Sequence, residues 1–420
     1  MDKMADVLGR AGAWCGQNKY LSAIKNAFQN FMPLTIAGAI GVLWCNVLVN
    51  DQTGLGLFFK PIMALDFLNP AFQAVNFCTI SCITVGITLG IAQEIGVWNM
   101  GAERAGYIPG LVGLAAWLSV TNTSHMVEGA KEAFTGIAGN ELGATGLFTG
   151  MIIGVLSVEL FCFFEKQDAL KIKMPEQVPP GVARAFEVLV PATITLIITA
   201  CIGSACYNLT GLYLNDVIKN GIQGPLGAVG ATIPGVMIIY LVIMLFWLVG
   251  IHGNNMLSAV KEALFTPLAL ENVEKFNKGE KPTNIINMYF LQMCGEFGGS
   301  GVTIGLVIAI MIFGKREDNK AIASLSLVPG LFNINETVTF GIPMVLNPIL
   351  GIPFVVAPLI TIIIGYVLTV IGFCPVACLT VPWTTPPIVF GFLACGANVM
   401  GAVTQAILIV VSTVIYVPFL

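Results

Sequence analysis

One ionisable side chain in a long apolar region marks where chemistry is expected. Between residues 321 and 420 the only charged residue is Glu336, within the stretch 329–343. A charge at the centre of a membrane span costs about 2.5–3.5 kcal/mol on insertion scales, so such groups usually have a partner or a function. A structural carboxylate is the alternative, but the same hundred residues contain no basic side chain. We therefore expect Glu336 to lie at the centre of a binding site.

Three clusters of acids, amides and aromatic rings supply the other candidates. They lie in residues 246–256, 294–300 and 333–336, and a tryptophan follows near residue 383. The candidate ligand-binding residues are Glu336, His252, Glu296, Asn254, Asn335, Asn333, Trp247 and Trp383. Glu336 and His252 are the candidates for a catalytic role.

This mixture of side chains suits a sugar. Carboxylates and carboxamides pair with vicinal hydroxyl groups as acceptors and donors, and Trp247 and Trp383 offer flat faces for the apolar side of a pyranose ring. A metal site would need more carboxylates or imidazoles, and the chain has only two histidines. An anion site would need arginine. We expect neither metal nor cofactor.

Each candidate also has an ordinary structural interpretation. His252 follows an apolar stretch beside glycines and fits a plain loop histidine equally well. Trp247 resembles the tryptophans of a membrane–water interface. Glu296 in its glycine-rich break favours function, whereas Trp383 stays open between the two interpretations.

Composition makes the chain a multi-pass membrane protein. Hydrophobic residues form 56% of its 420 residues and charged residues 10%, against roughly 25% charged in a soluble domain. No cleavable signal peptide is apparent. Segments of near 20 apolar residues span a bilayer, and about ten are expected. The more regular candidates are 26–49, 73–95, 105–121, 145–164, 186–210, 229–251, 302–314, 352–373 and 399–419.

Basic residues predict the orientation of the first half. They cluster before the first span and between the fourth and fifth spans, at Lys3, Arg10, Lys19, Lys25, Lys166, Lys171, Lys173 and Arg184. The positive-inside rule then makes the amino terminus cytoplasmic and turns the acidic loop 122–144 outward. The charged stretch 261–281 is also expected to be a cytoplasmic loop.

Proline and glycine divide the chain and interrupt its second half. The polar segment 165–185 is predicted as a linker, and 212–225 as an interfacial helix or an external loop. Breaks near 295–301, 329–353 and 381–387 predict re-entrant hairpins, because broken backbone at membrane depth is tolerated beside protein or a water-filled cavity. We expect an N-terminal transmembrane dimerisation domain at 1–175, a linker, fifth span and interfacial segment at 176–228, and a C-terminal substrate-binding domain at 229–420.

Several motifs resemble one family of transporters. They occupy residues 23–34, 142–148, 178–186, 250–253 and 329–338, the last continuing to Asn347-Pro348. The chain resembles, over essentially its whole length, the enzyme IIC component of the bacterial sugar phosphotransferase system, in its lactose/cellobiose/diacetylchitobiose branch.

The resemblance implies an all-α homodimer of the elevator type in the bacterial inner (plasma) membrane. One β-linked disaccharide, of diacetylchitobiose or cellobiose type, would bind in each second half. His252 and Glu336 would contact the hydroxymethyl group whose O6 receives a phosphoryl group from a phosphocysteine of a cytoplasmic IIB protein, itself supplied by IIA. Because the sequence ends at Leu420 without a soluble extension, we expect IIB to be a separate polypeptide, as in cellobiose and diacetylchitobiose systems.

Two other classes of function remain open on the residues alone. An intramembrane acid equally suits a proton-coupled symporter in which Glu336 is the protonation site. A channel is disfavoured because no repeated charge lines a pore. Whether Glu336 removes the sugar proton as a general base or only holds the hydroxyl also stays open.

Overall fold

A computed structural model describes residues 2–51, 55–125, 134–175, 177–342 and 344–420. Helices dominate, as the predicted all-α class requires, and one antiparallel pair of two-residue strands joins Ser124–His125 to Phe134–Thr135. Residues 126–133 of the loop predicted to face outward, and Pro343 in the second predicted break, lie outside the described residues.

The elements of the first half are α1 Asp2–Gln17, α2 Lys19–Leu43, η1 Trp44–Leu48, η2 Leu55–Leu57, η3 Lys60–Leu68, α3 Asn69–Asn76, η4 Phe77–Ser81, α4 Ile83–Met100, α5 Ala102–Ala105, α6 Ile108–Val120, β1 Ser124–His125, β2 Phe134–Thr135, α7 Gly139–Leu142, α8 Ala144–Glu165, η5 Asp168–Leu170 and α9 Pro180–Thr210. The others are α10 Leu214–Ile218, η6 Lys219–Gln223, α11 Gly224–Gly230, α12 Ile233–Leu248, α13 Gly253–Met256, α14 Ser258–Asn277, α15 Met288–Gly295, η7 Ser300–Val302, α16 Ile304–Phe313, α17 Glu317–Leu331, α18 Glu336–Gly341, α19 Gly351–Val370, α20 Val389–Ala394, α21 Val399–Tyr416 and η8 Val417–Phe419.

Several of these helices are long and apolar enough to cross a membrane. Within the described residues five qualify singly, and the number rises to eight if each of three bent helix pairs forms one span. The five are Lys19–Leu48, Ala144–Glu165, Pro180–Thr210, Gly351–Val370 and Val399–Phe419. Each overlaps a predicted span, although Lys19–Leu48 and Pro180–Thr210 begin about two turns earlier than predicted. The predicted number of about ten stays a prediction.

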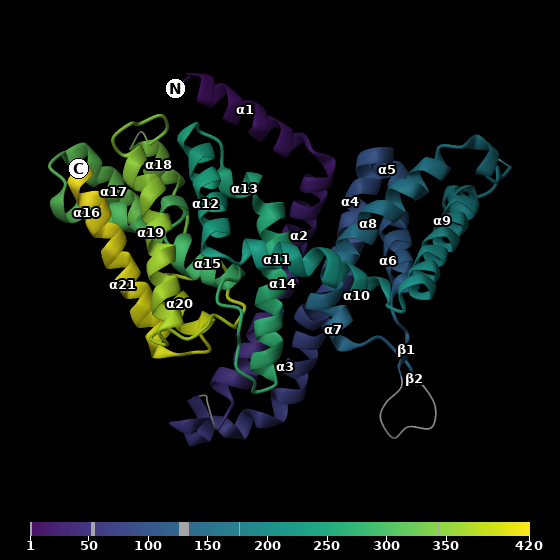
Figure 1. Cartoon of the computed structure of the whole chain (residues 1–420), viewed down its shortest axis with the longest axis horizontal. Helices are drawn as coiled ribbons and strands as arrows, with labels where there is room; N and C mark the ends of the chain where they lie inside the picture. The colour runs from purple at the N-terminus through teal and green to yellow at the C-terminus, as the bar shows by residue number, and fades with distance from the viewer. Residues whose placement is uncertain (1, 52–54, 126–133, 176, 343) are drawn as a thin grey trace. The chain divides into compact units, whose positions relative to one another are not determined.

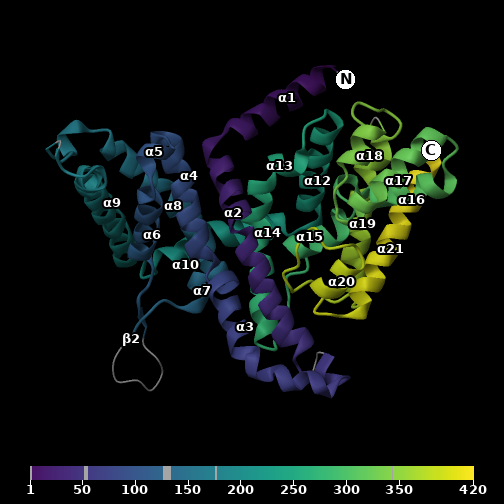
Figure 2. The ribbon, with the colours of Figure 1, turned by 180° about the vertical axis from the view of Figure 1, so that it is seen from behind.

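The chain forms two compact units (Figures 1 and 2). The first unit contains residues 1–17, 35–77 and 227–420, and the second contains 18–34 and 78–226. All eight candidate ligand-binding residues belong to the first unit. The domain roles expected from the sequence stay predictions.

In the second unit α4, α6 and α8 pack side by side, as Figure 1 shows. Trp117 of α6 is fully buried and packs with Val120 and with Ile153 of α8. Gly150 of α8 approaches Thr88 of α4 so closely that an added Cβ would lie 2.2 Å from the threonine Oγ1. The repeated glycines of α8 therefore allow close helix contact, the packing role that their four-residue spacing indicates.

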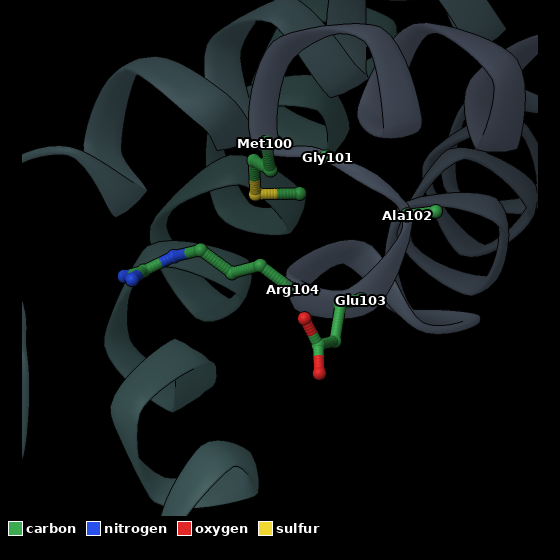
Figure 3. A pocket seen from close by; sticks show the side chains of 5 residues that line it. All are labelled: Met100, Gly101, Ala102, Glu103 and Arg104. Carbon is green, nitrogen blue, oxygen red and sulfur yellow. The ribbon is translucent and has the colours of Figure 1, made fainter.

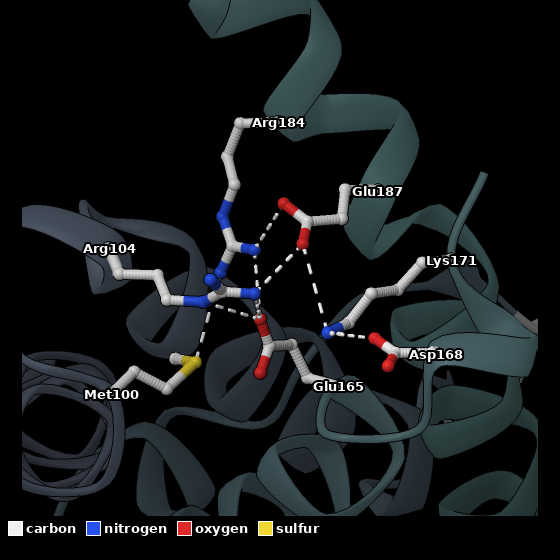
Figure 4. Close-up of polar contacts among 7 residues, drawn as sticks. All are labelled: Met100, Arg104, Glu165, Asp168, Lys171, Arg184 and Glu187. Atoms are coloured by element: carbon white, nitrogen blue, oxygen red, sulfur yellow. Dashed lines mark hydrogen bonds and ion pairs between the residues drawn. The ribbon is translucent and has the colours of Figure 1, made fainter. Parts of the chain in front are cut away.

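An ion-pair network fixes the start of the predicted linker within the second unit (Figure 4). Arg104 and Arg184 lie 2.8 and 2.9 Å from the buried Glu165 carboxylate at the end of α8. Both arginines also pair with Glu187 of α9 at 2.8 Å. Two guanidinium groups thus compensate a carboxylate that is only 3% exposed, which would be costly to bury alone.

In the first unit, one apolar helical segment is bent at a break in its backbone. The helices 288–302 and 304–313 meet at 57°, and Gly298, Gly299 and Gly301 adopt φ values of +70°, +89° and +77°. Glycine adopts this left-handed region without a steric penalty. The bend coincides with the glycine-rich break predicted from the sequence, while the hairpin itself stays a prediction.

The charged stretch 261–281 differs from the expected loop. It lies mostly within the twenty-residue helix α14, Ser258–Asn277. Charged side chains suggested a loop, but Lys261 is buried and paired within the protein, so its charge does not indicate exposure to water. This difference brings a basic side chain toward the candidate site.

Candidate functional site

The structure brings His252 and Glu336 together. His252 directly precedes α13, and Glu336 is the first residue of α18. Nε2 of His252 lies 3.9 Å from Oε1 of Glu336, and the side chains are 37% and 48% exposed. The gap exceeds a direct hydrogen bond, whereas a hydroxyl oxygen about 2.8 Å from both atoms fits beside it. The pair can therefore hold one hydroxyl group between a donor and an acceptor.

The hydrogen bonds of His252 define which ring nitrogen faces that gap. Nδ1 accepts a hydrogen bond from the backbone N–H of Asn255 at 3.2 Å. A neutral imidazole then carries its proton on Nε2, toward Glu336. Burial lowers the pKa of His252 below its usual value, and the Glu336 carboxylate offsets part of this effect. His252 is therefore a hydrogen-bond donor at neutral pH.

Trp247 packs behind the imidazole. It is 2% exposed, and its ring centroid lies 4.4 Å from that of His252. Phe340 and Phe354 contact its other sides, each with a centroid distance of 6.5 Å. This burial favours a role in holding the His252 ring over a position at the lipid interface, and contact with sugar stays a prediction for Trp247.

A second cluster surrounds Glu296. Tyr240 donates a hydrogen bond to Glu296 Oε1 at 2.8 Å, and Lys261 forms an ion pair with the same oxygen. Lys261 also donates to Asn254 Oδ1 at 3.1 Å. Among the residues that the structure describes, Tyr240 and Lys261 both bind Oε1 of Glu296. Its other oxygen, Oε2, can therefore accept a hydrogen bond from a ligand hydroxyl.

Sequence reasoning missed Lys261, Tyr240 and Ser300. Lys261 was assigned to a charged loop. Tyr240 lies inside an apolar span, where its neighbours in the sequence gave no indication of a binding site. Asn254 lies in α13 and Lys261 in α14, on either side of Leu257, so their proximity depends on how the two helices meet and no local sequence signal shows it.

Ser300 in the helix break connects the two clusters. Its Oγ accepts a hydrogen bond from Asn254 Nδ2 at 2.9 Å, and its carbonyl accepts one from Asn335 Nδ2 at 2.9 Å. Asn254 lies two residues from His252, and Asn335 directly precedes Glu336. The glycine-rich break therefore sets the position of His252 relative to Glu336, although the two are distant in sequence.

Asn333 and Trp383 are hydrogen-bonded to each other near the candidate site. The Asn333 side chain accepts from the Gly298 N–H at 2.6 Å and donates to the carbonyls of Trp383 and Thr385. These bonds tie segment 382–388 to the helix break. The Trp383 side chain is 43% exposed and remains available to stack on a ligand. Ligand contacts of Asn333 and Trp383 stay predictions.

A surface pocket lies elsewhere. It has a volume of about 530 Å³ and is lined by Met100, Gly101, Ala102, Glu103 and Arg104 of the second unit (Figure 3). None of the predicted ligand-binding residues lines it. The Arg104 guanidinium is already bound to two carboxylates, so it is not free to bind an anion in this pocket.

The apolar helices define a helical membrane protein, and the polar cluster around His252 and Glu336 is its candidate small-molecule site. A family model described as "Phosphotransferase system, EIIC" matches residues 25–358. The chain is 32% identical to the oligo-beta-mannoside-specific EIIC component of Bacillus subtilis (strain 168), across 100% of this chain and 93% of that protein.

Two further proteins are similar across nearly the whole chain. The cellobiose-specific EIIC component of Lactococcus lactis subsp. lactis (strain IL1403) is 30% identical, over 99% of this chain and 96% of that protein. The crystal structure of the transporter ChbC, the IIC component from the N,N'-diacetylchitobiose-specific phosphotransferase system, superposes with a TM-score of 0.88 at 29% identity, covering 97% and 94%. The chain belongs to the EIIC family of the phosphotransferase system.

Proposed function

We propose that this EIIC component binds a β-linked disaccharide, of cellobiose or diacetylchitobiose type, and passes it inward for phosphorylation at O6. The observation that carries the proposal is the 3.9 Å gap between His252 Nε2 and Glu336 Oε1. The names of the similar proteins, which include oligo-beta-mannoside, cellobiose and N,N'-diacetylchitobiose, support a β-linked sugar.

In the proposed reaction the gap holds the sugar 6-hydroxyl. His252 Nε2–H donates a hydrogen bond to O6, and Glu336 accepts a hydrogen bond from the hydroxyl group. When a phosphocysteine of a IIB component arrives, O6 attacks phosphorus, the sulfur–phosphorus bond breaks, and the cysteine leaves as a thiolate. Glu336 takes the proton if it acts as general base, a contribution of typically 10²–10⁴-fold in rate.

Charge explains why the product would leave. The Lys261 cation is already paired with Glu296 and shared with Asn254, so it is not free to bind a phosphate. A sugar phosphate beside the Glu336 carboxylate is repelled, since like charges a few ångströms apart interact unfavourably. Phosphorylation would thus release the sugar and trap it inside the cell.

The remaining parts of the proposal concern assembly. We propose a homodimer of the elevator type in the bacterial plasma membrane with a cytoplasmic amino terminus, about ten spans and re-entrant hairpins in the second half. We assign residues 1–175 to dimerisation, 176–228 to the linker, fifth span and interfacial segment, and 229–420 to sugar binding. IIA and IIB would be the phosphoryl-carrying partners.

The test is uptake of labelled cellobiose and diacetylchitobiose into vesicles that contain the purified protein, with and without IIB, IIA and a phosphoryl donor inside. We expect labelled sugar 6-phosphate only when the whole relay is present. Accumulation of unmodified sugar under a proton gradient alone would contradict the proposal and identify a symporter. A thermal-shift panel with cellobiose, lactose and diacetylchitobiose then ranks the sugars.

A further inference from the structure

Two cysteines outside the candidate sugar site lie in contact. The Sγ atoms of Cys374 and Cys395 are 3.9 Å apart although the residues are 21 positions apart in the chain. They are 1% and 4% exposed. Both thiols also lie near the carbonyl oxygen of Pro375, at 3.4 and 3.3 Å. The sequence shows no C-x-x-C motif, so their proximity arises only from the fold.

The two cysteines lie at the base of the segment that carries Trp383. Backbone N–H groups of Cys378 and Leu379 donate to the carbonyl of Ala394 at 2.7 and 3.1 Å. The chain therefore leaves and returns at one place, and Cys374 and Cys395 face each other there. The far part of the same segment is bonded to Asn333 through the carbonyls of Trp383 and Thr385.

We propose that Cys374 and Cys395 form a redox-sensitive dithiol, which a small hydroperoxide converts to a disulfide that restrains the Trp383 segment. The Cys374 thiolate attacks a peroxide oxygen, giving a sulfenic acid and hydroxide. The Cys395 thiol then attacks the sulfenic sulfur, and water leaves. In total, two thiols and one hydrogen peroxide give one disulfide and two waters, and the two electrons pass to the peroxide.

The local chemistry and access support this assignment. A hydrogen bond from Cys395 lowers the pKa of the Cys374 thiol, and the thiolate is the reactive form of cysteine. Cys374 is buried, but it lies two residues after Gly372, and Ile371 and Gly372 are exposed, so the reactive thiol lies close in sequence to the protein surface.

A disulfide here would slow the sugar reaction. It would fasten the base of segment 375–394 while Asn333 holds the far part, so Trp383 would lose freedom to move as a sugar enters or leaves. Constraining a chain segment by a cross-link reduces the conformations it can adopt. The effect on rate rests on the proposed function, whereas formation of the disulfide does not.

The test exposes the protein in vesicles to hydrogen peroxide, blocks remaining thiols with N-ethylmaleimide and maps peptides without reductant. We expect a Cys374–Cys395 peptide pair, two hydrogens lighter than the free-thiol peptides and separated by dithiothreitol. Cys374→Ser and Cys395→Ser should each remove it, whereas Cys378→Ser, a neighbouring buried cysteine, should retain it. Absence of this pair, or pairing through Cys378, would overturn the proposal.

The rate of sugar phosphorylation is measured on the same samples. Peroxide should reduce it several-fold in the wild type and in Cys378→Ser, dithiothreitol should restore it, and Cys374→Ser should not respond. A complete cross-link with an unchanged rate would overturn the restraint of Trp383. A reduced protein that phosphorylates no sugar would instead count against the proposed function, with the peptide map still deciding the dithiol.

Discussion

At the scale of residues, the candidate site depends on the hydrogen-bond state of a few side chains. Asn255 N–H occupies Nδ1 of His252, so Nε2–H points at Glu336 across 3.9 Å. Lys261, which is buried, forms an ion pair with the partly buried Glu296 carboxylate, so neither charge lacks a partner. Sequence patterns singled out His252, Glu336 and Glu296 as candidates, and the structure brings His252 and Glu336 together. They could not identify Lys261, because its pairing depends on how α14 packs.

Sugar binding and phosphoryl transfer should both be sensitive to loss of the His252 Nε2–H donor. We expect His252→Ala to weaken sugar binding or slow phosphoryl transfer by about 0.5–1.5 kcal/mol, because the sugar hydroxyl loses its hydrogen-bond donor. Isothermal titration with cellobiose and a transfer assay measure the two effects. Near-normal binding and transfer would remove His252 from the site.

Acid should destabilise the protein through the same residue. The folded pKa of His252 lies below the usual value, so between the two values the unfolded chain binds more protons. The free energy of unfolding therefore falls as the pH drops below about 6.5. Thermal unfolding of wild type and His252→Gln at about pH 7.5 and 5.5 checks this, and equal pH responses would contradict it.

Lys261 and Glu296 should be energetically coupled. Removing either partner leaves a largely buried charge unpaired, so Lys261→Met and Glu296→Gln should each destabilise the fold by about 3 kcal/mol. The double variant should lose less than the sum, with a coupling of roughly 0.5–3 kcal/mol. Chemical denaturation of all four proteins measures the cycle, and additive losses would show that the pair is not coupled.

At the scale of elements, the helix break at residues 298–301 determines the site. Its Ser300 bonds both Asn254 and Asn335, which lie beside His252 and Glu336. The glycines of 295–301 predicted an interruption at this place, and the structure has one. Which groups the break would connect depends on the packing of three distant segments, so local sequence could not show it. For the same reason, the sequence could not show that the Asn333 side chain binds backbone groups of Gly298, Trp383 and Thr385.

A substitution in the break should disturb the site more than strain alone explains. Gly299 has φ +89°, and an added Cβ would lie 2.6 Å from Cβ of Asn335. Gly279 has φ +73° but nothing within 4 Å, which makes it a matched control. Gly279→Ala should cost about 1–2 kcal/mol of backbone strain, and Gly299→Ala a further 1–3 kcal/mol of overpacking.

Transfer rates should separate these two variants further. Displacing Asn335 moves Glu336, so Gly299→Ala should lose at least about tenfold in transfer rate, with Gly279→Ala close to wild type. Denaturation and the transfer assay provide both measurements. Equal effects of the two alanines on rate would mean that the break does not position Glu336.

At the scale of the whole molecule, composition and motifs were sufficient to predict the family to which the chain belongs. The 56% hydrophobic and 10% charged residues predicted a helical membrane protein, and the family match over residues 25–358 confirms the resemblance. Assembly depends on surfaces between copies of the chain, which side-chain patterns describe poorly. We expect native mass spectrometry in mild detergent to give a dimer, and a monomer across micromolar concentrations would contradict the proposed assembly.

The central claim is that Glu336 acts on the hydroxyl that receives the phosphoryl group. Its most direct test compares wild type and Glu336→Gln for phosphoryl transfer to cellobiose from IIB, with sugar binding and folding measured in parallel. The account predicts a folded protein that binds sugar within about tenfold of wild type but loses roughly 10²–10⁴-fold in transfer. Transfer within a few-fold of wild type would contradict the general-base role and leave Glu336 only as a hydrogen-bond acceptor.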